Sequence, residues 1–211
     1  MRCLKKKVLN KEKLKIGLVT YRGNPSSGGQ GIYINYLSRA LSDLGHEVTV
    51  ISGPPYPDIR KDIKLVKLPS LDLFSKKNKF LDVKFSKLLS LNNLKEWISA
   101  NTGGFPEPHT FGPRLKKFIE ENADQFDVIH DNQSLCKELI SLQQKLPLVT
   151  TIHHPITKDL EFQLKSTNDF FLKLLIKRWH SFIPTQIKVA KKLKKILVPS
   201  KSSEKDVVKD F

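Results

Sequence analysis

The chain has 211 residues, in which 37 Lys or Arg outnumber 21 Asp or Glu and give a formal net charge of +16. Its length is enough for one α/β domain that buries about 70% of the surface of the unfolded chain. The positive charge favours an anionic partner, which leaves nucleic acid, phosphorylated small molecules and an anionic membrane surface open.

Cysteine usage and the N-terminal segment both indicate a cytoplasmic protein. The two cysteines, Cys3 and Cys136, lie far apart in the sequence, which is not a disulfide framework and is typical of a reducing compartment. Residues 1–14 are expected to form a basic extension, because lysines interrupt the apolar stretch that a signal peptide needs. No apolar run approaches the roughly 18 residues of a transmembrane helix.

Residues 15–52 predict a β-strand, a glycine-rich loop, a helix and a second strand. The first strand is a short aliphatic run, and the helix is indicated by apolar residues at mostly helical spacing. Gly45 follows at the position where a helix would stop. The predicted strands are residues 16–19 and 48–51, and the helix is residues 32–44. This order is a βαβ unit with parallel strands.

The loop between the first strand and the helix is the first candidate site. Glycines at the start of a helix let backbone N–H groups approach an anion. The dinucleotide fingerprint is incomplete, because Gly29 and Gly31 are followed by Ile34 at the third glycine position and no acid ends the second strand. A P-loop sequence is absent as well. A tight turn without a ligand remains an alternative, but Gly28, Gly29 and Gln30 are more than such a turn needs.

Strands and helices continue to alternate after residue 52, which predicts a doubly wound parallel sheet with helices on both faces. Further strands are expected at residues 63–68, 126–130, 148–152 and 196–198. Helices are expected at 80–91, from Pro113 onward, at 135–142, over a long region to residue 194 that is broken near Pro184, and at 200–211 with Ser202 or Ser203 near its cap. Residues 102–109 are expected to be irregular.

Polar side chains follow several of these strands, and ligands of such sheets bind beyond the carboxyl ends of the strands. The loops that hold Gly28 and Gly29, His130 to Asn132, and His153 with His154 should therefore meet on one rim. Asp131 and Asn132 suit either helix capping or the binding of acceptor hydroxyls, and the sequence does not decide between the two. Zinc ligation by the histidines has no supporting ligand spacing.

His153 directly follows the strand LVTTI. A single histidine at a strand end is most often a capping or core residue. The adjacent His154 and the stiff Pro155 favour a functional role, in which an imidazole with a pKa near 6.5 hydrogen-bonds a ligand.

Residues 165–195 carry nine Lys or Arg and a single acid, Asp169, with Phe and Trp among them. A buried helix with a solvated basic face explains part of this pattern. A basic amphipathic helix with aromatic residues is also typical of proteins that bind membrane surfaces. No nucleic-acid partner is expected, because no helix-turn-helix, zinc-finger or RNA-recognition signature accompanies the charge.

The sequence GGQGIYINYLSRALSDLGHEVTV resembles the opening of the glycosyltransferases of family 4, which have the two-domain GT-B fold. The resemblance rests on a gap-free pattern formed by Gly28, Gly29, Leu37, Leu41, Gly45, His46, Val48 and Val50. It implies that residues 15–211 are the N-terminal, acceptor-side Rossmann-like domain of a retaining glycosyltransferase. The donor would be a nucleotide-diphosphate sugar, and neither a cofactor nor a metal is expected.

The resemblance also assigns roles to individual residues. In TTIHHPITKD, His153 matches the strand-end histidine that lies beneath the transferred sugar, and it is the predicted catalytic residue. The donor phosphates would lie on the loop of Gly28, Gly29 and Gln30. The acceptor, a sugar, lipid or small molecule of glycan or glycolipid synthesis, would contact His109, Asp131, Asn132, His154 and Lys158.

The pattern of a GT-B donor domain is absent from the 211 residues, so a C-terminal domain in cis or a partner chain is expected to complete the site. The chain alone is then expected to be inactive. The alternative is a non-catalytic basic module that binds a phosphorylated ligand, a membrane or nucleic acid. The expected location is the cytoplasm, with peripheral attachment to the inner face of the cell membrane as an option.

Overall fold

The computed structural model describes residues 13–25 and 29–211, and it contains a six-stranded sheet in the order β3-β2-β1-β4-β5-β6 with every neighbouring pair parallel. The strands are β1 (Lys15–Thr20), β2 (Glu47–Ser52), β3 (Lys64–Lys67), β4 (Val128–Asn132), β5 (Leu148–Thr151) and β6 (Ile196–Leu197). This is the doubly wound, Rossmann-like α/β fold that the sequence predicts.

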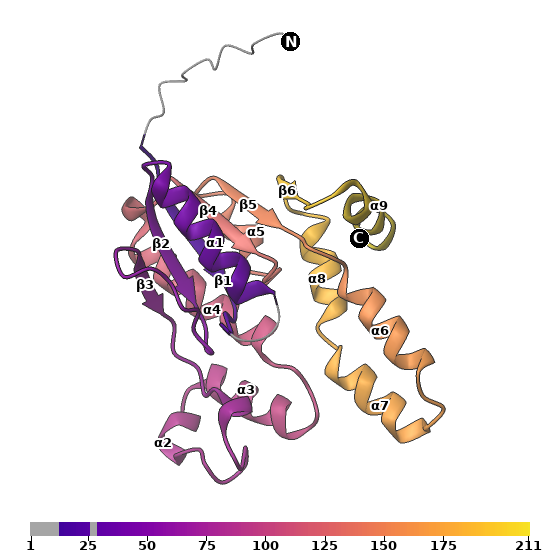
Figure 1. Ribbon diagram of the computed structural model, residues 1–211. Helices are drawn as coiled ribbons and strands as arrows, with labels where there is room; N and C mark the ends of the chain where they lie inside the picture. The colour runs from indigo at the N-terminus through magenta and orange to yellow at the C-terminus, as the bar shows by residue number, and fades with distance from the viewer. Residues whose placement is uncertain (1–12, 26–28) are drawn as a thin grey trace.

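Helices cover both faces of the sheet (Figure 1). The longer helices are α1 (Gln30–Asp43), α3 (Leu91–Asn101), α4 (Glu107–Glu121), α6 (Ile156–Lys165), α7 (Phe170–Trp179), α8 (Ile183–Ala190) and α9 (Lys201–Asp210). Two helices are single turns, α2 (Phe85–Leu88) and α5 (Leu139–Leu142), and two 3-10 turns lie at Leu73–Ser75 and Ala123–Gln125.

The alternation of β1 side chains explains the two hydrophobic layers. Ile16 and Leu18 point to one face and pack in a cluster with Ile34 of α1, whereas Val19 belongs to the larger cluster on the other face, with Leu115 of α4. Because a strand directs successive side chains to opposite faces, a central strand that is apolar throughout requires a helix layer on each side.

Residues 71–102 and 156–180 form a projection below the sheet in Figure 1, which we call the helical lobe. Its two parts are in contact, since the rings of Phe74 and Trp179 lie 5.4 Å apart and Arg178 Nη2 donates to Thr102 Oγ1 at 2.8 Å. None of the described helices is long and apolar enough to cross a membrane.

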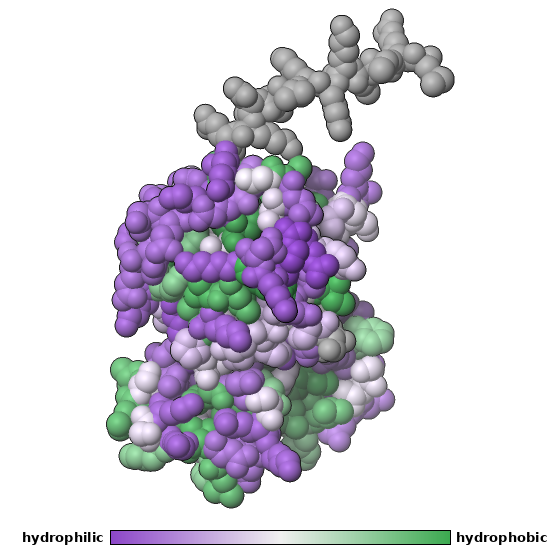
Figure 2. Space-filling model, turned by 60° about the vertical axis from the view of Figure 1, so that its left-hand side comes forward, coloured by the Kyte–Doolittle hydropathy of each residue, from purple (hydrophilic) through white to green (hydrophobic). Residues whose placement is uncertain are grey.

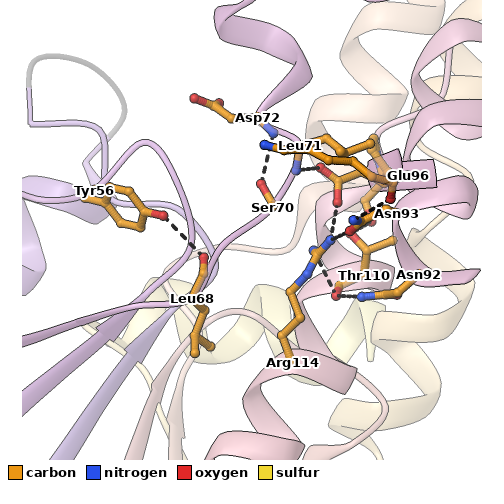
Figure 3. Close-up of polar contacts among 12 residues, drawn as sticks. Tyr56, Leu68, Ser70, Leu71, Asp72, Asn92, Asn93, Glu96, Thr110 and Arg114 are labelled. Carbon is orange, nitrogen blue, oxygen red and sulfur yellow. Dashed lines mark hydrogen bonds and ion pairs between the residues drawn. The ribbon is translucent and has the colours of Figure 1, made fainter. Parts of the chain in front are cut away.

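A buried ion pair fastens the lobe to the sheet layer (Figure 3). Glu96 of α3 has a side chain that is only 2% exposed, and its Oε2 accepts from Arg114 Nη2 of α4 at 2.6 Å. Its Oε1 accepts from the N–H of Leu71 at 2.9 Å, and Arg114 also donates to Asn93 Oδ1 at 2.7 Å. One carboxylate therefore joins α3, α4 and the segment that follows β3.

The helix predicted over residues 80–91 is wrong in its bounds. Only Phe85–Leu88 is helical there, and a second helix begins after Ser90, whose extended ψ of 123° separates the two. The apolar residues that indicated the longer helix are mostly exposed, with Phe85 at 78% and Leu89 at 75%. Their spacing therefore did not reflect burial against a core.

The other corrections concern helix ends. Helix α4 begins at Glu107 rather than near Pro113, which lies inside it, so residues 107–109 are not irregular. The predicted helix 135–142 is reduced to α5, because Leu135 has a φ of +47° that a helix cannot contain.

The long helical region is three helices. It is broken between Trp179 and Ile183, next to the predicted position, and Pro184 itself lies in the first turn of α8. Ser200, and neither Ser202 nor Ser203, caps α9, with its Oγ accepting from the Ser203 N–H at 3.1 Å.

Candidate functional site

A cavity of about 720 Å³ opens at the carboxyl ends of the strands, between the loop after β1 and the loops after β4 and β5. The chain order of the sheet reverses between β1 and β4, which is where doubly wound folds bind ligands. The cavity is lined by Tyr21, Arg22, Asn24, Gly29, Gln30, Tyr33, Gln133, His153, His154, Ile156 and Asp159. The predicted loops of Gly29 and of His153 with His154 both contribute to it. His130 to Asn132 belong to β4 and do not line the cavity, and the loop after β4 contributes Gln133 instead.

His153 lines this cavity two residues after the end of β5 and next to the end of β4. Its Nε2 lies 2.7 Å from Asn132 Oδ1, and its ring packs edge-on against Tyr33 of α1 with centroids 4.6 Å apart. An amide oxygen only accepts, so Nε2 carries the proton and Nδ1 is left as an acceptor.

The pKa of His153 lies below the usual histidine value, because burial disfavours the charged ring and His154 adds like charge. His153 is therefore a neutral, oriented imidazole at neutral pH. Such a ring can accept a hydrogen bond from a sugar hydroxyl without first losing a proton.

Gln133 fixes the backbone at this point. Its Oε1 accepts from the His153 N–H and its Nε2 donates to the His154 carbonyl oxygen, both at 2.7 Å. Its own φ of +50° turns the chain away from β4 so that the side chain reaches across to the loop after β5. The two strand-end loops therefore hold each other in place.

Asp131 and Asn132 are the last residues of β4, and both are fully buried. The Asp131 carboxylate accepts from the Ser134 N–H at 3.2 Å and from the Ser134 hydroxyl. Burial raises the pKa of Asp131 to about 6. These contacts hold the turn that follows β4 and cap no helix, because α5 begins only at Leu139 with Glu138 at its N-cap. The capping alternative is therefore wrong for Asp131, and Asn132 orients His153. Asn132 Nδ2 is buried and has no hydrogen-bond partner among the described residues.

The glycines of the predicted donor loop differ in what they do. Gly28 lies outside the described residues. Gly29 precedes the first residue of α1, and a Cβ built on it would meet nothing within 4 Å, so a side chain there would enter open space at the cavity. A Cβ on Gly31 would lie 2.2 Å from the carbonyl oxygen of Asn24. Gly31 is therefore required for packing, and Gly29 leaves room for a ligand.

Of the remaining predicted site residues, two line the cavity and two do not. Gln30 lines the cavity and hydrogen-bonds the Tyr21 hydroxyl. His154 also lines it, with Nε2 3.0 Å from Asp159 Oδ2. Lys158 does not, and its Nζ lies 3.4 Å from Asp206 Oδ1. His109 is exposed on α4 and is not part of the lining.

Arg22 and Tyr33 are cavity residues that the sequence pattern did not single out. The Arg22 guanidinium lies 5.6 Å from the centroid of the Phe105 ring and forms no ion pair with a described residue. A signal for both existed, since Arg22 comes two residues after β1 and Tyr33 lies in the first turn of the helix that follows. Arg22 gives the cavity a cation that can attract an anionic ligand.

The histidines do not form a metal site. In the described part of the chain, no three His, Cys, Asp or Glu side chains are placed to hold a metal ion. His130, which the zinc alternative would require, has its Nε2 2.7 Å from Thr151 Oγ1.

Comparison with known proteins gives consistent matches. Residues 27–211 match the family model described as Glycosyltransferase Family 4. The MMP alpha-(1->4)-mannosyltransferase of Mycolicibacterium hassiacum is 38% identical over 200 residues, which cover 94% of this chain and 48% of that protein. The chain thus spans about half the length of this curated relative.

Solved structures with related folds are more distant. Os79 from O. sativa, in complex with UDP, has a TM-score of 0.49 and 11% identity, over 92% of this chain and 48% of its own. A UDP-glucose: anthocyanidin 3-O-glucosyltransferase, also in complex with UDP, has a TM-score of 0.46 and 9% identity, over 94% of this chain and 50% of its own.

Proposed function

Because the chain belongs to glycosyltransferase family 4, we propose that it forms the acceptor-side domain of a retaining, nucleotide-sugar-dependent glycosyltransferase. The transferred group is a hexosyl group, and the similarity to a mannosyltransferase makes mannose the first sugar to test. The acceptor is a sugar, a lipid or a small molecule of glycan or glycolipid synthesis.

The observation that carries this proposal is the cavity between Gly29 and His153. The first N–H groups of the 14-residue helix α1 open onto it, and the absence of a side chain at Gly29 leaves space for a diphosphate. Helix N-termini favour anions because of these unpaired N–H groups. Arg22 lines the same cavity and adds positive charge.

In this proposal, His153 contacts the transferred sugar. Its neutral ring, held by Asn132 and Gln133, would accept a hydrogen bond from a sugar hydroxyl through Nδ1. An interaction that strengthens as the sugar becomes positively charged accelerates transfer, because it stabilises the transition state more than the bound substrate.

The rest of the donor site would come from a second domain, in cis or on a partner chain. Sugar transfer requires donor phosphates and acceptor in one closed site. The length of the mannosyltransferase relative, of which this chain covers 48%, supports this division. The 211-residue chain alone would then transfer no sugar.

By the natural-length protein we mean this chain together with the further domain or the partner chain that completes its site. Labelled nucleotide-diphosphate sugars test the proposal, with mannose and glucose donors offered to the 211-residue chain and to the natural-length protein, each with a panel of mono- and disaccharide acceptors. We expect transfer with retained configuration only for the natural-length protein. Turnover by the 211-residue chain would overturn the division of the site, and absence of transfer or hydrolysis of every donor by the natural-length protein would overturn the function.

A further inference from the structure

The helical lobe exposes most of the large apolar side chains on the described surface. Of the 19 large hydrophobic residues that are exposed, 13 lie in the lobe. They are Phe80, Leu81, Phe85, Leu89, Leu91, Ile98, Phe162, Phe170, Phe171, Leu172, Leu174, Leu175 and Trp179. Figure 2 shows apolar patches, separated by hydrophilic residues, over the lower part of the molecule. Apolar surface that gathers in this way marks a contact site.

Three of the helices that carry this surface have no buried residues of their own, whereas α3 buries Glu96 and Ala100. In α7, whose sequence is FFLKLLIKRW, no residue is buried, and the same is true of α2 and α6. An amphipathic helix normally owes its stability to an apolar face packed against a core. Here Phe170 and Phe171 remain 68% and 77% exposed, so the fold leaves their apolar surface for an external partner.

Positive charge lies among these apolar side chains and is not neutralised within the fold. Lys77, Lys84, Lys87, Lys95 and Lys177 are exposed and form no ion pair with any residue that the structure describes. The sequence of the lobe contains eleven Lys or Arg and only six Asp or Glu. Three of these acids are already engaged, because Glu96 pairs with Arg114, Glu161 pairs with Lys165, and Asp169 caps α7. The charge available to a partner is therefore positive.

We propose that the helical lobe binds the surface of an anionic lipid bilayer. Exposed Phe and Leu that alternate with unpaired lysines are complementary to acyl chains and anionic headgroups together. A second copy of the chain would present the same uncompensated lysines, so like charges would meet. The lobe also adjoins the cavity, because α6 contributes Ile156 to the cavity lining and Phe162 to the exposed surface. A bound bilayer would thus lie beside the cavity entrance.

Vesicle flotation tests this with the natural-length protein. Vesicles of phosphatidylcholine alone are compared with vesicles that contain one third phosphatidylglycerol. We expect binding to the anionic vesicles that weakens with added salt. Dissolved ions screen charges over about 8 Å at physiological ionic strength, and this distance becomes shorter as salt is added. Neutralising two lysines in the variant Lys173→Gln with Lys177→Gln should reduce the partition coefficient roughly tenfold or more.

The apolar part is tested by Phe170→Ser with Phe171→Ser, which should also lower binding at least tenfold. The matched controls lie on α9, where Val208→Ser and the pair Lys201→Gln with Lys205→Gln change equally exposed residues and should leave binding unchanged. Circular dichroism and transfer to a water-soluble acceptor should be unaltered in every variant, which separates this result from the proposed function.

Equal binding to both vesicle types, equal loss in the α9 controls, or no vesicle binding would overturn the proposal. Concentration-dependent dimerisation that the Phe170 and Phe171 changes abolish would assign the surface to a second copy instead and would overturn it as well.

Discussion

Two consecutive residues at the end of β4 position His153, one through its ring and the other through its backbone. Asn132 fixes the tautomer through a 2.7 Å hydrogen bond and Gln133 fixes the backbone at the same distance. An oriented group of this kind acts without reorganisation when charge develops in a substrate. The consequences of this arrangement can be measured one residue at a time.

Replacing His153 by Ala should lower turnover about 10²-fold or more, roughly 2.7 kcal/mol, while donor affinity stays nearly unchanged. The reason is that the lost hydrogen bond would be made mainly in the transition state. Steady-state kinetics and donor titrations on the natural-length protein measure the two effects. His154→Ala is the control and should do less, because its ring is engaged with Asp159 at the cavity edge. Full turnover in a well-folded His153→Ala protein would return His153 to a structural role.

Gly29→Val should raise the donor Kd and KM by more than it changes acceptor binding. The added side chain would occupy open space where the diphosphate is proposed to lie, and Gly29 has an ordinary φ of −44°, so little stability should be lost. Donor titration together with thermal melts checks this expectation.

Gly31→Ala is the contrasting variant, because its methyl group would lie 2.2 Å from the Asn24 carbonyl oxygen and should lower the Tm. Unchanged donor binding in Gly29→Val would make the loop purely structural.

Among the secondary-structure elements, the central strands were the easiest to predict. β1, β2 and β5 contain short runs or alternations of Ile, Leu and Val and end in Thr or Ser, and the structure places them within one or two residues of the predicted bounds. The helical lobe was not predictable in the same way. Its apolar residues are spaced like a core helix but are exposed, so periodicity alone could not tell a buried face from a binding surface.

The candidate site shows the same division. The strand-end rule placed Gly29, Gln30, His153 and His154 correctly at one cavity. The rule does not predict the orientation of side chains. No sequence pattern indicated that Asp131 is buried or that Arg22 lines the cavity. Whether a polar residue at a strand end points to solvent or inward depends on the left-handed turn at Gln133, which the sequence does not signal.

The attachment of the helical lobe depends on one buried carboxylate. Glu96→Ala should lower the free energy of unfolding by about 3 kcal/mol, because it leaves the partly buried Arg114 guanidinium without its partner and the buried Leu71 N–H without an acceptor. Urea denaturation measures the loss.

Replacing both partners, with Glu96→Met and Arg114→Met, should cost less than Glu96→Ala alone, since neither charge then remains buried. A loss below about 1 kcal/mol in Glu96→Ala would show that the lobe is held mainly by its apolar contacts.

For the molecule as a whole, Asp131 makes stability depend on pH. Its folded-state pKa of about 6 lies above the ordinary value of 3.8, so protonation favours the folded state. This contribution is fully present below pH 3.8 and is lost as pH rises through about 6. It amounts to at most about 3 kcal/mol.

The side chain of the Asp131→Asn variant cannot ionise. Between pH 4 and pH 7, the free energy of unfolding of the variant should therefore rise relative to that of the unmodified protein. Urea unfolding at several pH values gives this difference directly. The buried histidines act in the opposite direction, since the pKa values of His130 and His153 are lowered, but they are common to both proteins and cancel in the comparison. A difference that does not vary with pH would mean that the pKa of Asp131 is the same in the folded and the unfolded state.

The central position of β1 has a consequence for synthesis of the chain on the ribosome. β1 pairs with β2, which follows soon after it, but its other neighbour is β4, so that Lys15 bonds to Asp127, 112 residues further along. Roughly 75 residues separate β2 from β4, and translation at about 5–20 residues per second takes several seconds to supply them. A half-sheet formed in that interval would have β1 as an open edge strand, which can pair with another chain until Val128 emerges and β4 covers it.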